Sequence, residues 1–205
     1  RMTALEDWEL LRAFEVISQT KLPVIVHAEN ENLIAHYTKE LRDQGKTYPL
    51  AHNESRPEIT EIEAVTRAIC FAQASKVHLH LAHLSLPESF ALVLEGQDKG
   101  VFVTAETCPH YLVLNMDRWK DIGARYKINP PLRSEEARMG LWELLADGYI
   151  NLVGSDNAPH TPEIVDDIFD NPSGSPGIET LVPLVFSEGV SQGQISLSRF
   201  AQLIS

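Results

Sequence analysis

Four short apolar segments, each followed by a stretch with helical periodicity, constrain the fold of this chain most strongly. They lie within LPVIVHAEN (22–30), KVHLHLAHLS (76–85), GVFVTAET (100–107) and YINLVGSD (149–156). Short runs rich in Val, Ile and Leu are typical of strands that are buried on both faces. Strands that alternate with helices form βα units and lie parallel. The pattern therefore predicts an α/β fold with a parallel sheet.

Helices are expected between these segments and around them. Apolar residues at three- and four-residue steps predict helices at about 3–19, 32–45, 60–75 and 87–98. Thr60 and Glu63 have capping-box spacing, which predicts a helix start. Ser134 is the expected N-cap of a helix that runs to Asp147, and two further helical stretches follow the last strand.

Length and composition narrow the class of protein. A chain of 205 residues can bury a large core, and one domain over residues 1–205 is expected. Seventeen basic and twenty-nine acidic residues give a net charge of -12, which argues against binding to nucleic acid or to anionic membranes. No apolar run approaches transmembrane length. Two cysteines, Cys70 and Cys108, are too few for a disulfide framework, so we expect a cytoplasmic protein.

Polar residues follow each apolar segment at a similar place. They are His27, His83, Glu106 and Asp156. The carboxyl ends of parallel strands meet at one side of a sheet, where α/β proteins place their sites. A single buried histidine is more often structural, but two imidazoles and a carboxylate at equivalent positions suit zinc or a similar divalent metal. We therefore predict His27, His83 and Asp156 as metal ligands.

Three histidines lie close together in HLHLAHLS. On a strand, alternate residues point to opposite faces, so His78 and His80 point away from the face of Leu79 and Leu81. Strand periodicity places His83 on the face of the leucines. We predict His83 as the ligand and a structural role for His78 and His80.

Three other segments leave alternatives open. In TAETCPHYL, Glu106 and His110 are candidate acid–base groups, a shaped loop is the simpler interpretation, and Cys108 as a nucleophile is a weaker alternative. Arg56 in SRPEIT is expected in a solvated loop. The segment NPSGSPGIET (171–180) is either a turn before a helix or a loop whose backbone amides face an anionic substrate.

Six consecutive segments together resemble the cyclic amidohydrolases, a group that includes dihydroorotase, allantoinase and hydantoinase. The segments, within residues 22–186, are VIVHAEN, HLHLAHLS, AETCPHYL, KINPPLR, GSDNAPHT and NPSGSPGIETLVPL. The APHT sequence and the last segment look most like dihydroorotase, with allantoinase close behind.

The resemblance implies part of a (β/α)8 TIM-type barrel, strands five to eight with their helices, with one or two divalent metal ions, expected to be zinc. By this resemblance His27 and His83 are metal ligands and Asp156 is both metal ligand and general base. The residues implied to hold the substrate are Asn129, His160, Ser173 and Gly174.

The chain also departs from the family pattern. Asn157 stands where the family usually has histidine, which suggests a change around the metal and not its loss. The family's first-strand His-x-His pair and its bridging carboxylate have no counterpart in this sequence, so part of the ligand set is expected upstream. A half-barrel exposes an edge and an apolar face. We therefore expect the remainder of a barrel, or another copy in a homo-oligomer, to cover it, and the isolated chain to be inactive.

The resemblance implies a metal-dependent hydrolase of a small cyclic amide, with dihydroorotase, which interconverts dihydroorotate and N-carbamoyl-L-aspartate in pyrimidine biosynthesis, as the first expectation. Allantoinase or a hydantoinase-type enzyme is the alternative within the group. A non-catalytic, dihydroorotase-like structural partner is the alternative of another class. The sequence does not decide among these substrates, nor the number of metals.

Overall fold

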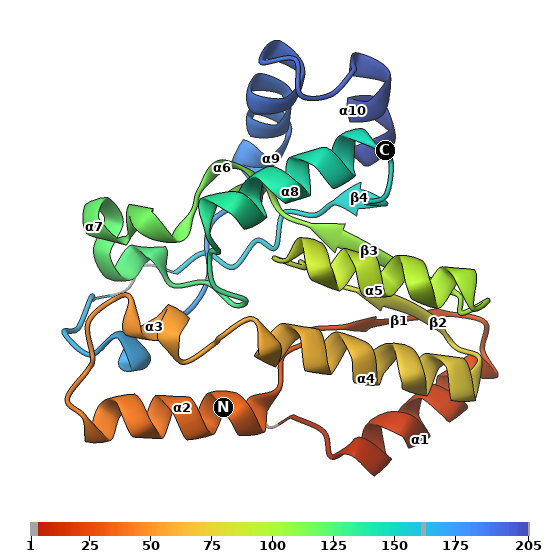
Figure 1. Cartoon of the computed structure of the whole chain (residues 1–205), viewed down its shortest axis with the longest axis horizontal. Coiled ribbons are helices and arrows are strands. Elements are labelled where there is room, and N and C mark those ends of the chain that lie inside the picture. The colour runs from red at the N-terminus through yellow and green to blue at the C-terminus, as the bar shows by residue number, and fades with distance from the viewer. Residues whose placement is uncertain (1–3, 161–162, 205) are drawn as a thin grey trace.

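The computed structural model describes residues 4–160 and 163–204, and its centre is a sheet of four parallel strands (Figure 1). The strands are β1 (Pro23–Val26), β2 (His78–Leu81), β3 (Val103–Thr107) and β4 (Leu152–Val153). They lie in the order β1-β2-β3-β4, so each strand pairs with its neighbour in the sequence. This order is the one that consecutive βα units produce, and it confirms the predicted α/β class with a parallel sheet.

The helices cover the sheet and continue beyond it. Those that precede β3 are α1 (Asp7–Ser18), α2 (Glu31–Asp43), α3 (Ala51–Glu54), α4 (Ile59–Ser75) and α5 (Pro87–Asp98). Those between β3 and β4 are α6 (Pro109–Val113), η1 (Met116–Arg118), α7 (Trp119–Ile122), η2 (Gly123–Tyr126) and α8 (Glu135–Ala146). The last are η3 (Ile168–Asp170), α9 (Ile178–Leu184), the π-helical η4 (Val185–Ser191) and α10 (Leu197–Ile204).

The two faces of the sheet differ. Leu79 and Leu81 of β2 are fully buried on the face that packs against α4 and α5, whereas His78 and His80 point to the other face and remain partly accessible. On that second face Ile25 of β1 keeps 68% of its surface exposed. The predicted orientation of His78 and His80 is therefore confirmed.

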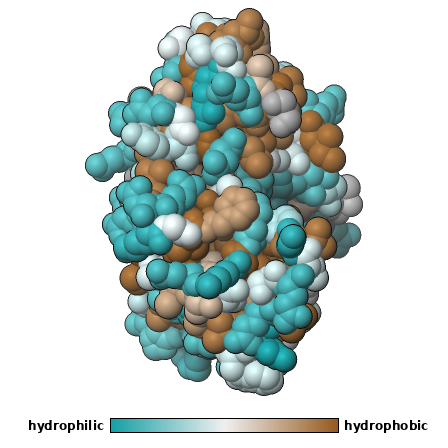
Figure 2. Space-filling model, turned by 90° about the vertical axis from the view of Figure 1, so that its right-hand side faces the viewer, coloured by the Kyte–Doolittle hydropathy of each residue, from teal (hydrophilic) through white to brown (hydrophobic). Residues whose placement is uncertain are grey.

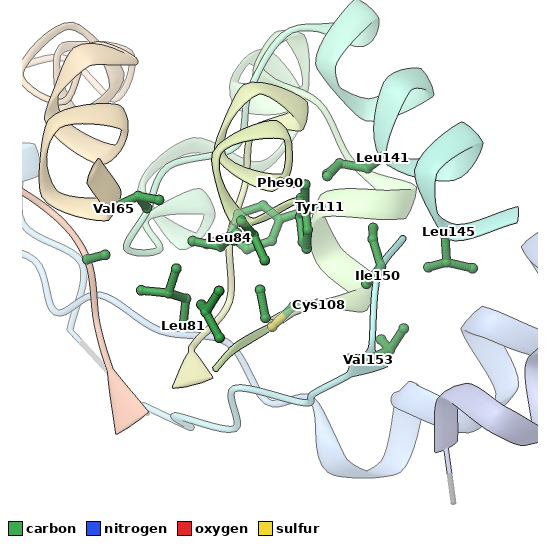
Figure 3. Packing of buried hydrophobic residues seen from close by; sticks show 14 of the residues in the cluster. Val65, Leu81, Leu84, Phe90, Cys108, Tyr111, Leu141, Leu145, Ile150 and Val153 are labelled. Atoms are coloured by element: carbon green, nitrogen blue, oxygen red, sulfur yellow. The ribbon is translucent and has the colours of Figure 1, made fainter. Parts of the chain in front are cut away.

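The core lies between the sheet and the helices (Figure 3). Leu81 of β2 and Val153 of β4 face Phe90 of α5 and Leu141 and Leu145 of α8 in one continuous cluster. Each fully buried Leu or Phe side chain contributes about 1.5–3 kcal/mol relative to an exposed one. This packing fixes the strands, and with them the loops that follow each strand.

Several predicted helix boundaries agree closely with the structure. The helix at 87–98 has the predicted ends, and the Ser134 side chain caps α8 by accepting a hydrogen bond from the backbone N–H of Ala137 at 3.1 Å.

Two local predictions were wrong. Thr60 lies inside α4 and its hydroxyl donates to the carbonyl of Pro57, so it is no N-cap. The segment after Cys108 forms the short helix α6, with Pro109 in its first turn, and not a loop.

Figure 2 shows the molecule from the side on which the strands begin, where apolar and polar side chains are interspersed. The candidate site lies at the opposite ends of the strands. Within residues 4–160 and 163–204, every helix is too short or too polar to span a membrane.

Candidate metal and substrate site

Two histidines converge where β1 and β2 end. His27 directly follows β1, and His83 comes two residues after β2. Since β1 and β2 are adjacent and parallel, both residues lie at the same end of the sheet, where the strands end. The Nδ1 atom of His27 is 3.0 Å from the Nε2 atom of His83, and the two rings meet edge to face. The predicted pair of ligands is therefore brought together.

His83 is buried, and its surroundings favour the neutral form of the imidazole. Burial lowers its pKa, the nearby charge of His27 lowers it further, and the negative charge of Asp156 opposes both effects. Neutral imidazole is the form that binds metal ions. Asp156, which follows β4, is thus close enough to His83 to act on it electrostatically.

The same two residues, His83 and Asp156, have an uncommon backbone conformation. Both have φ of 42°, in the left-handed region. Non-glycine residues enter this region infrequently, and such residues cluster at functional sites. The turn also explains why strand periodicity fails at His83: the strand ends at Leu81, so His83 belongs to no face of the sheet.

The donor set fits part of a divalent metal site. Two nitrogen ligands of tetrahedral zinc, each about 2.0–2.1 Å from the metal, lie about 3.3 Å apart. The 3.0 Å separation of the His27 and His83 nitrogens is close to this value. Among the described residues, however, no three His, Cys, Asp or Glu side chains form one metal-holding group, so Asp156 does not complete a three-ligand cluster here.

Glu29 and Arg56 are neighbours of His27 that the sequence interpretation did not include among the site residues. Glu29 Oε2 lies 3.0 Å from Nε2 of His27, and the same oxygen forms an ion pair with Arg56. Burial alone would raise the pKa of Glu29, but its bond to His27 and the charge of Arg56 lower that pKa to about 2. Only 14% of the Arg56 side chain is exposed, so its prediction as part of a solvated loop was wrong. The only sequence signal was a carboxylate two residues after His27.

Three of the predicted substrate residues lie together in two packed loops. His160 Nε2 donates to the backbone carbonyl of Ser173 at 3.1 Å. Gly174 has φ of 145°, and a Cβ atom there would lie 2.5 Å from the carbonyl oxygen of Ala158 and 3.2 Å from the His160 ring. Only glycine allows the loop of Ser173 and Gly174 to approach the loop of His160 this closely.

Asn129 belongs to a loop that neighbouring side chains hold by its backbone. His52 Nε2 donates to the carbonyl of Ile128 at 2.7 Å, and the Tyr111 hydroxyl donates to that of Pro130 at 2.7 Å. The Oδ1 atom of Asn129 is buried and has no hydrogen-bond partner among the described residues. A buried acceptor without a partner is costly, so this atom suits a ligand or a water molecule. The loop also meets Gly174, whose N–H donates to the carbonyl of Lys127 at 2.9 Å.

Asn157 does not point to the histidine pair. Its Oδ1 accepts hydrogen bonds from the backbone N–H groups of Gly177 at 3.0 Å and Ile178 at 3.4 Å, at the start of α9. The side chain therefore fastens the loop after β4 to the loop that carries Ser173 and Gly174.

The remaining polar candidates have structural surroundings. His80 Nδ1 contacts the Thr104 hydroxyl at 2.8 Å, and Glu106 lies within β3, 3.5 Å from His80 Nε2. Burial lowers the pKa of His110 to about 3. Cys108 is fully buried, and burial raises the pKa of its thiol well above the usual value, which argues against a nucleophilic role.

Comparisons with known proteins agree with this arrangement. No protein-family model matches the chain. The chain is 32% identical over 202 residues to the allantoinase of Escherichia coli O9:H4 and to that of Salmonella newport, and each alignment covers 98% of this chain and 45% of the relative. The chain thus spans about half the length of the curated relatives it matches.

Solved structures superpose closely on the whole chain. A D-hydantoinase has a TM-score of 0.95 at 31% identity, and the superposition covers 100% of this chain and 46% of the D-hydantoinase chain. The dihydropyrimidinase from Brevibacillus agri has a TM-score of 0.93 at 34% identity, with 98% and 45% covered. The L-hydantoinase from Arthrobacter aurescens has a TM-score of 0.95 at 32% identity, with 99% and 46% covered.

These similarities confirm the expected fold class, part of a TIM-type amidohydrolase barrel. Over nearly all of its length, the chain is similar to allantoinases, hydantoinases and a dihydropyrimidinase, and it matches about half of the length of each.

Proposed function

We propose that this chain supplies part of the metal and substrate site of a cyclic amidohydrolase of the allantoinase or hydantoinase type. The observation that carries the proposal is the convergence of His27 Nδ1 and His83 Nε2 at 3.0 Å, beside Asp156. In this proposal residues 1–205 form strands five to eight of the barrel with their helices. The dihydroorotase expected first from the sequence is less well supported, since the similar proteins reported above are allantoinases, hydantoinases and a dihydropyrimidinase.

The proposed cofactor is zinc or another divalent metal. When bound, such an ion lowers the pKa of water and polarises a carbonyl group. His27 and His83 would hold it through the two converging nitrogens. His27 Nε2 faces the Glu29 carboxylate, which leaves Nδ1 as the nitrogen that faces His83 Nε2.

Asp156 is the proposed general base. Its carboxylate would accept a proton from the attacking water and return it to the leaving ring nitrogen, a double role that one positioned carboxylate can perform. Asp156 is the third residue after β4, its backbone is left-handed with φ of 42°, and its charge acts on His83.

The loops around Gly174 and Asn129 are the proposed substrate site. His160 holds the Ser173 carbonyl, and the unpartnered Oδ1 of Asn129 can accept a hydrogen bond from a ring N–H of a cyclic amide. These groups orient a small polar ring and need no large apolar pocket.

The substrate class is tested by assaying the whole protein that contains this chain with allantoin, hydantoin, dihydrouracil and dihydroorotate. Hydrolysis of one of the first three, with dihydroorotate much slower, is the expected result. Preference for dihydroorotate would contradict the allantoinase or hydantoinase type but keep the reaction class. Absence of both bound metal and hydrolysis would favour the non-catalytic structural partner.

A further inference from the structure

We propose that Glu29 is a positioning residue that turns the Nδ1 lone pair of His27 toward His83. The proposal rests on the proposed metal-binding role of these two histidines. It names the residues that hold the two imidazoles in their relative orientation.

The contact between Glu29 and His27 selects one form of the imidazole. The Glu29 side chain is 2% exposed, and its Oε2 lies 3.0 Å from Nε2 of His27. A carboxylate only accepts hydrogen bonds, so Nε2 carries a proton, and in the neutral imidazole the lone pair is then on Nδ1. Nδ1 is the atom that lies 3.0 Å from His83 Nε2. The carboxylate thus fixes both the tautomer and the direction of the ring.

Glu29 is itself held by Arg56. The guanidinium of Arg56 pairs with the same Oε2 atom that accepts from His27. The backbone carbonyl of Arg56 in turn accepts a hydrogen bond from the guanidinium of Arg133 at 2.7 Å. The loop before α4 is therefore fastened to the loop that carries Asn129.

Arg133 closes the connection to the second histidine. Its Nε donates to the Ser85 hydroxyl at 2.9 Å, and Ser85 lies two residues after His83. Glu61, which is fully buried, accepts from the Ser85 backbone N–H at 3.1 Å and from the Ser89 hydroxyl at 2.7 Å. Ser85 is therefore fixed from two sides.

A closed chain of contacts results, from His27 through Glu29, Arg56, Arg133 and Ser85 back to His83. The His27 side chain is 46% exposed, so packing alone does not fix the orientation of its imidazole. The closed chain of contacts fixes that orientation. Outer partners of metal-binding histidines act in this way, and their loss costs roughly 10–100-fold in metal affinity.

The test removes the acceptor without leaving a buried charge. We would replace Glu29 and Arg56 together, as Glu29→Met with Arg56→Met, because exchanging both partners of a buried ion pair for apolar side chains is often neutral for stability. The single variant Glu29→Gln is the rescue, since its amide oxygen can accept the same proton. The matched control is Glu135→Met with Arg138→Met, which removes a carboxylate–arginine pair on α8.

The first readout is the tautomer of His27 in the whole protein after removal of metal by a chelator, from ¹⁵N chemical shifts of its ring at a pH where the ring is neutral. We expect the Nε2–H form in the unchanged chain, the Glu29→Gln variant and the control, and a mixture of both forms in the Glu29/Arg56 variant. A His27 that keeps the pure Nε2–H form in the Glu29/Arg56 variant would overturn the proposal.

The second readout is the dissociation constant of the whole protein that contains this chain for Zn²⁺ added as the simple salt. We expect it to rise about tenfold or more in the Glu29/Arg56 variant and to stay within twofold in the control. An unchanged constant in the Glu29/Arg56 variant counts against the proposal. A tautomer shift in a chain that binds no Zn²⁺ would keep the positioning role and overturn the metal site of the proposed function.

Discussion

His83 and Asp156 both have a left-handed backbone, each with φ of 42°, although they are 73 positions apart in the sequence. Each follows a short parallel strand, and the charge of Asp156 acts on His83. Two non-glycine residues in this conformation, after β2 and β4 at the carboxyl end of the same parallel sheet, indicate that the loops are shaped to present these side chains. The proposed roles of His83 and Asp156 depend on this shape of the two loops.

The role of Asp156 is tested by Asp156→Asn. Asparagine also tolerates a left-handed φ, so the fold should be retained. We expect kcat for the preferred cyclic amide to fall about 10²- to 10⁴-fold, because the amide cannot accept the proton from water. Steady-state kinetics of the whole protein measure this. Normal turnover in Asp156→Asn would exclude the residue as general base, and Asp147→Asn at the end of α8 serves as a control.

The close approach of the two substrate loops is tested by Gly174→Ala. The added methyl would lie 2.5 Å from the carbonyl oxygen of Ala158, in addition to the strain of φ 145°. We expect a loss of about 1–3 kcal/mol in the free energy of unfolding and a raised KM. Gly193→Ala is the control, because its Cβ meets no atom within 4 Å and only its φ of 76° is unfavourable. Equal effects of the two substitutions on stability and KM would show that the loops do not pack as described.

The pH dependence of stability is tested at His52. Burial, followed by the charge of Arg56, lowers the pKa of His52 to about 3 in the folded chain, against an ordinary value of 6.5. Between pH 6.5 and 3, His52 is therefore protonated in the unfolded chain and neutral in the folded chain. Stability is full above this window and falls as the pH drops through it, by up to about 1.4 kcal/mol per pH unit for one group.

The variant His52→Gln removes that group and can still donate a hydrogen bond to the Ile128 carbonyl. Urea unfolding over a pH series should give a flatter slope between pH 6.5 and 3 than the unchanged chain gives. The remaining slope is expected from His110, whose pKa is also lowered to about 3, from His83, whose pKa is lowered by burial, and below pH 4.5 from Glu29, whose pKa is lowered to about 2. His36→Gln, on an exposed position of α2, controls for the loss of a histidine. An identical slope in His52→Gln would contradict the buried, neutral state of His52.

The two cysteines should differ sharply in reactivity. Cys70 is exposed, whereas Cys108 is buried and its pKa is raised by burial. Under native conditions we expect iodoacetamide to modify Cys70, and to modify Cys108 only after unfolding. Mass spectrometry after timed labelling measures both sites. Rapid labelling of Cys108 in the folded protein would revive the alternative that Cys108 is a nucleophile.

Local patterns in the sequence were sufficient for much of the fold. The helix that begins at Pro87 and the Ser134 cap depend on neighbouring residues only, and both were predicted correctly. The convergence of His27 and His83 followed from the common direction of parallel strands. The helix start and the cap are set within single βα units, where hydrophobic period and caps are informative, and the convergence of the histidines needs only that adjacent units lie parallel.

Contacts between distant segments were not predictable in this way. Arg56 was placed in a solvated loop because its partner, Glu29, is 27 residues away and belongs to another βα unit. The left-handed turn at His83 also ended the strand earlier than periodicity suggested. Both errors concern residues next to the proposed metal site, where the structure departs from local preference in order to orient side chains.

The most direct test of the proposed function measures metal content and turnover together in the whole protein, with His83→Ala beside the unchanged sequence. The account predicts about one or two zinc ions per chain and hydrolysis of allantoin or hydantoin. It also predicts that the substitution lowers metal content and turnover together. Full metal content and turnover in His83→Ala would contradict the assigned ligand pair, and a protein with neither metal nor turnover would contradict the enzymatic proposal itself.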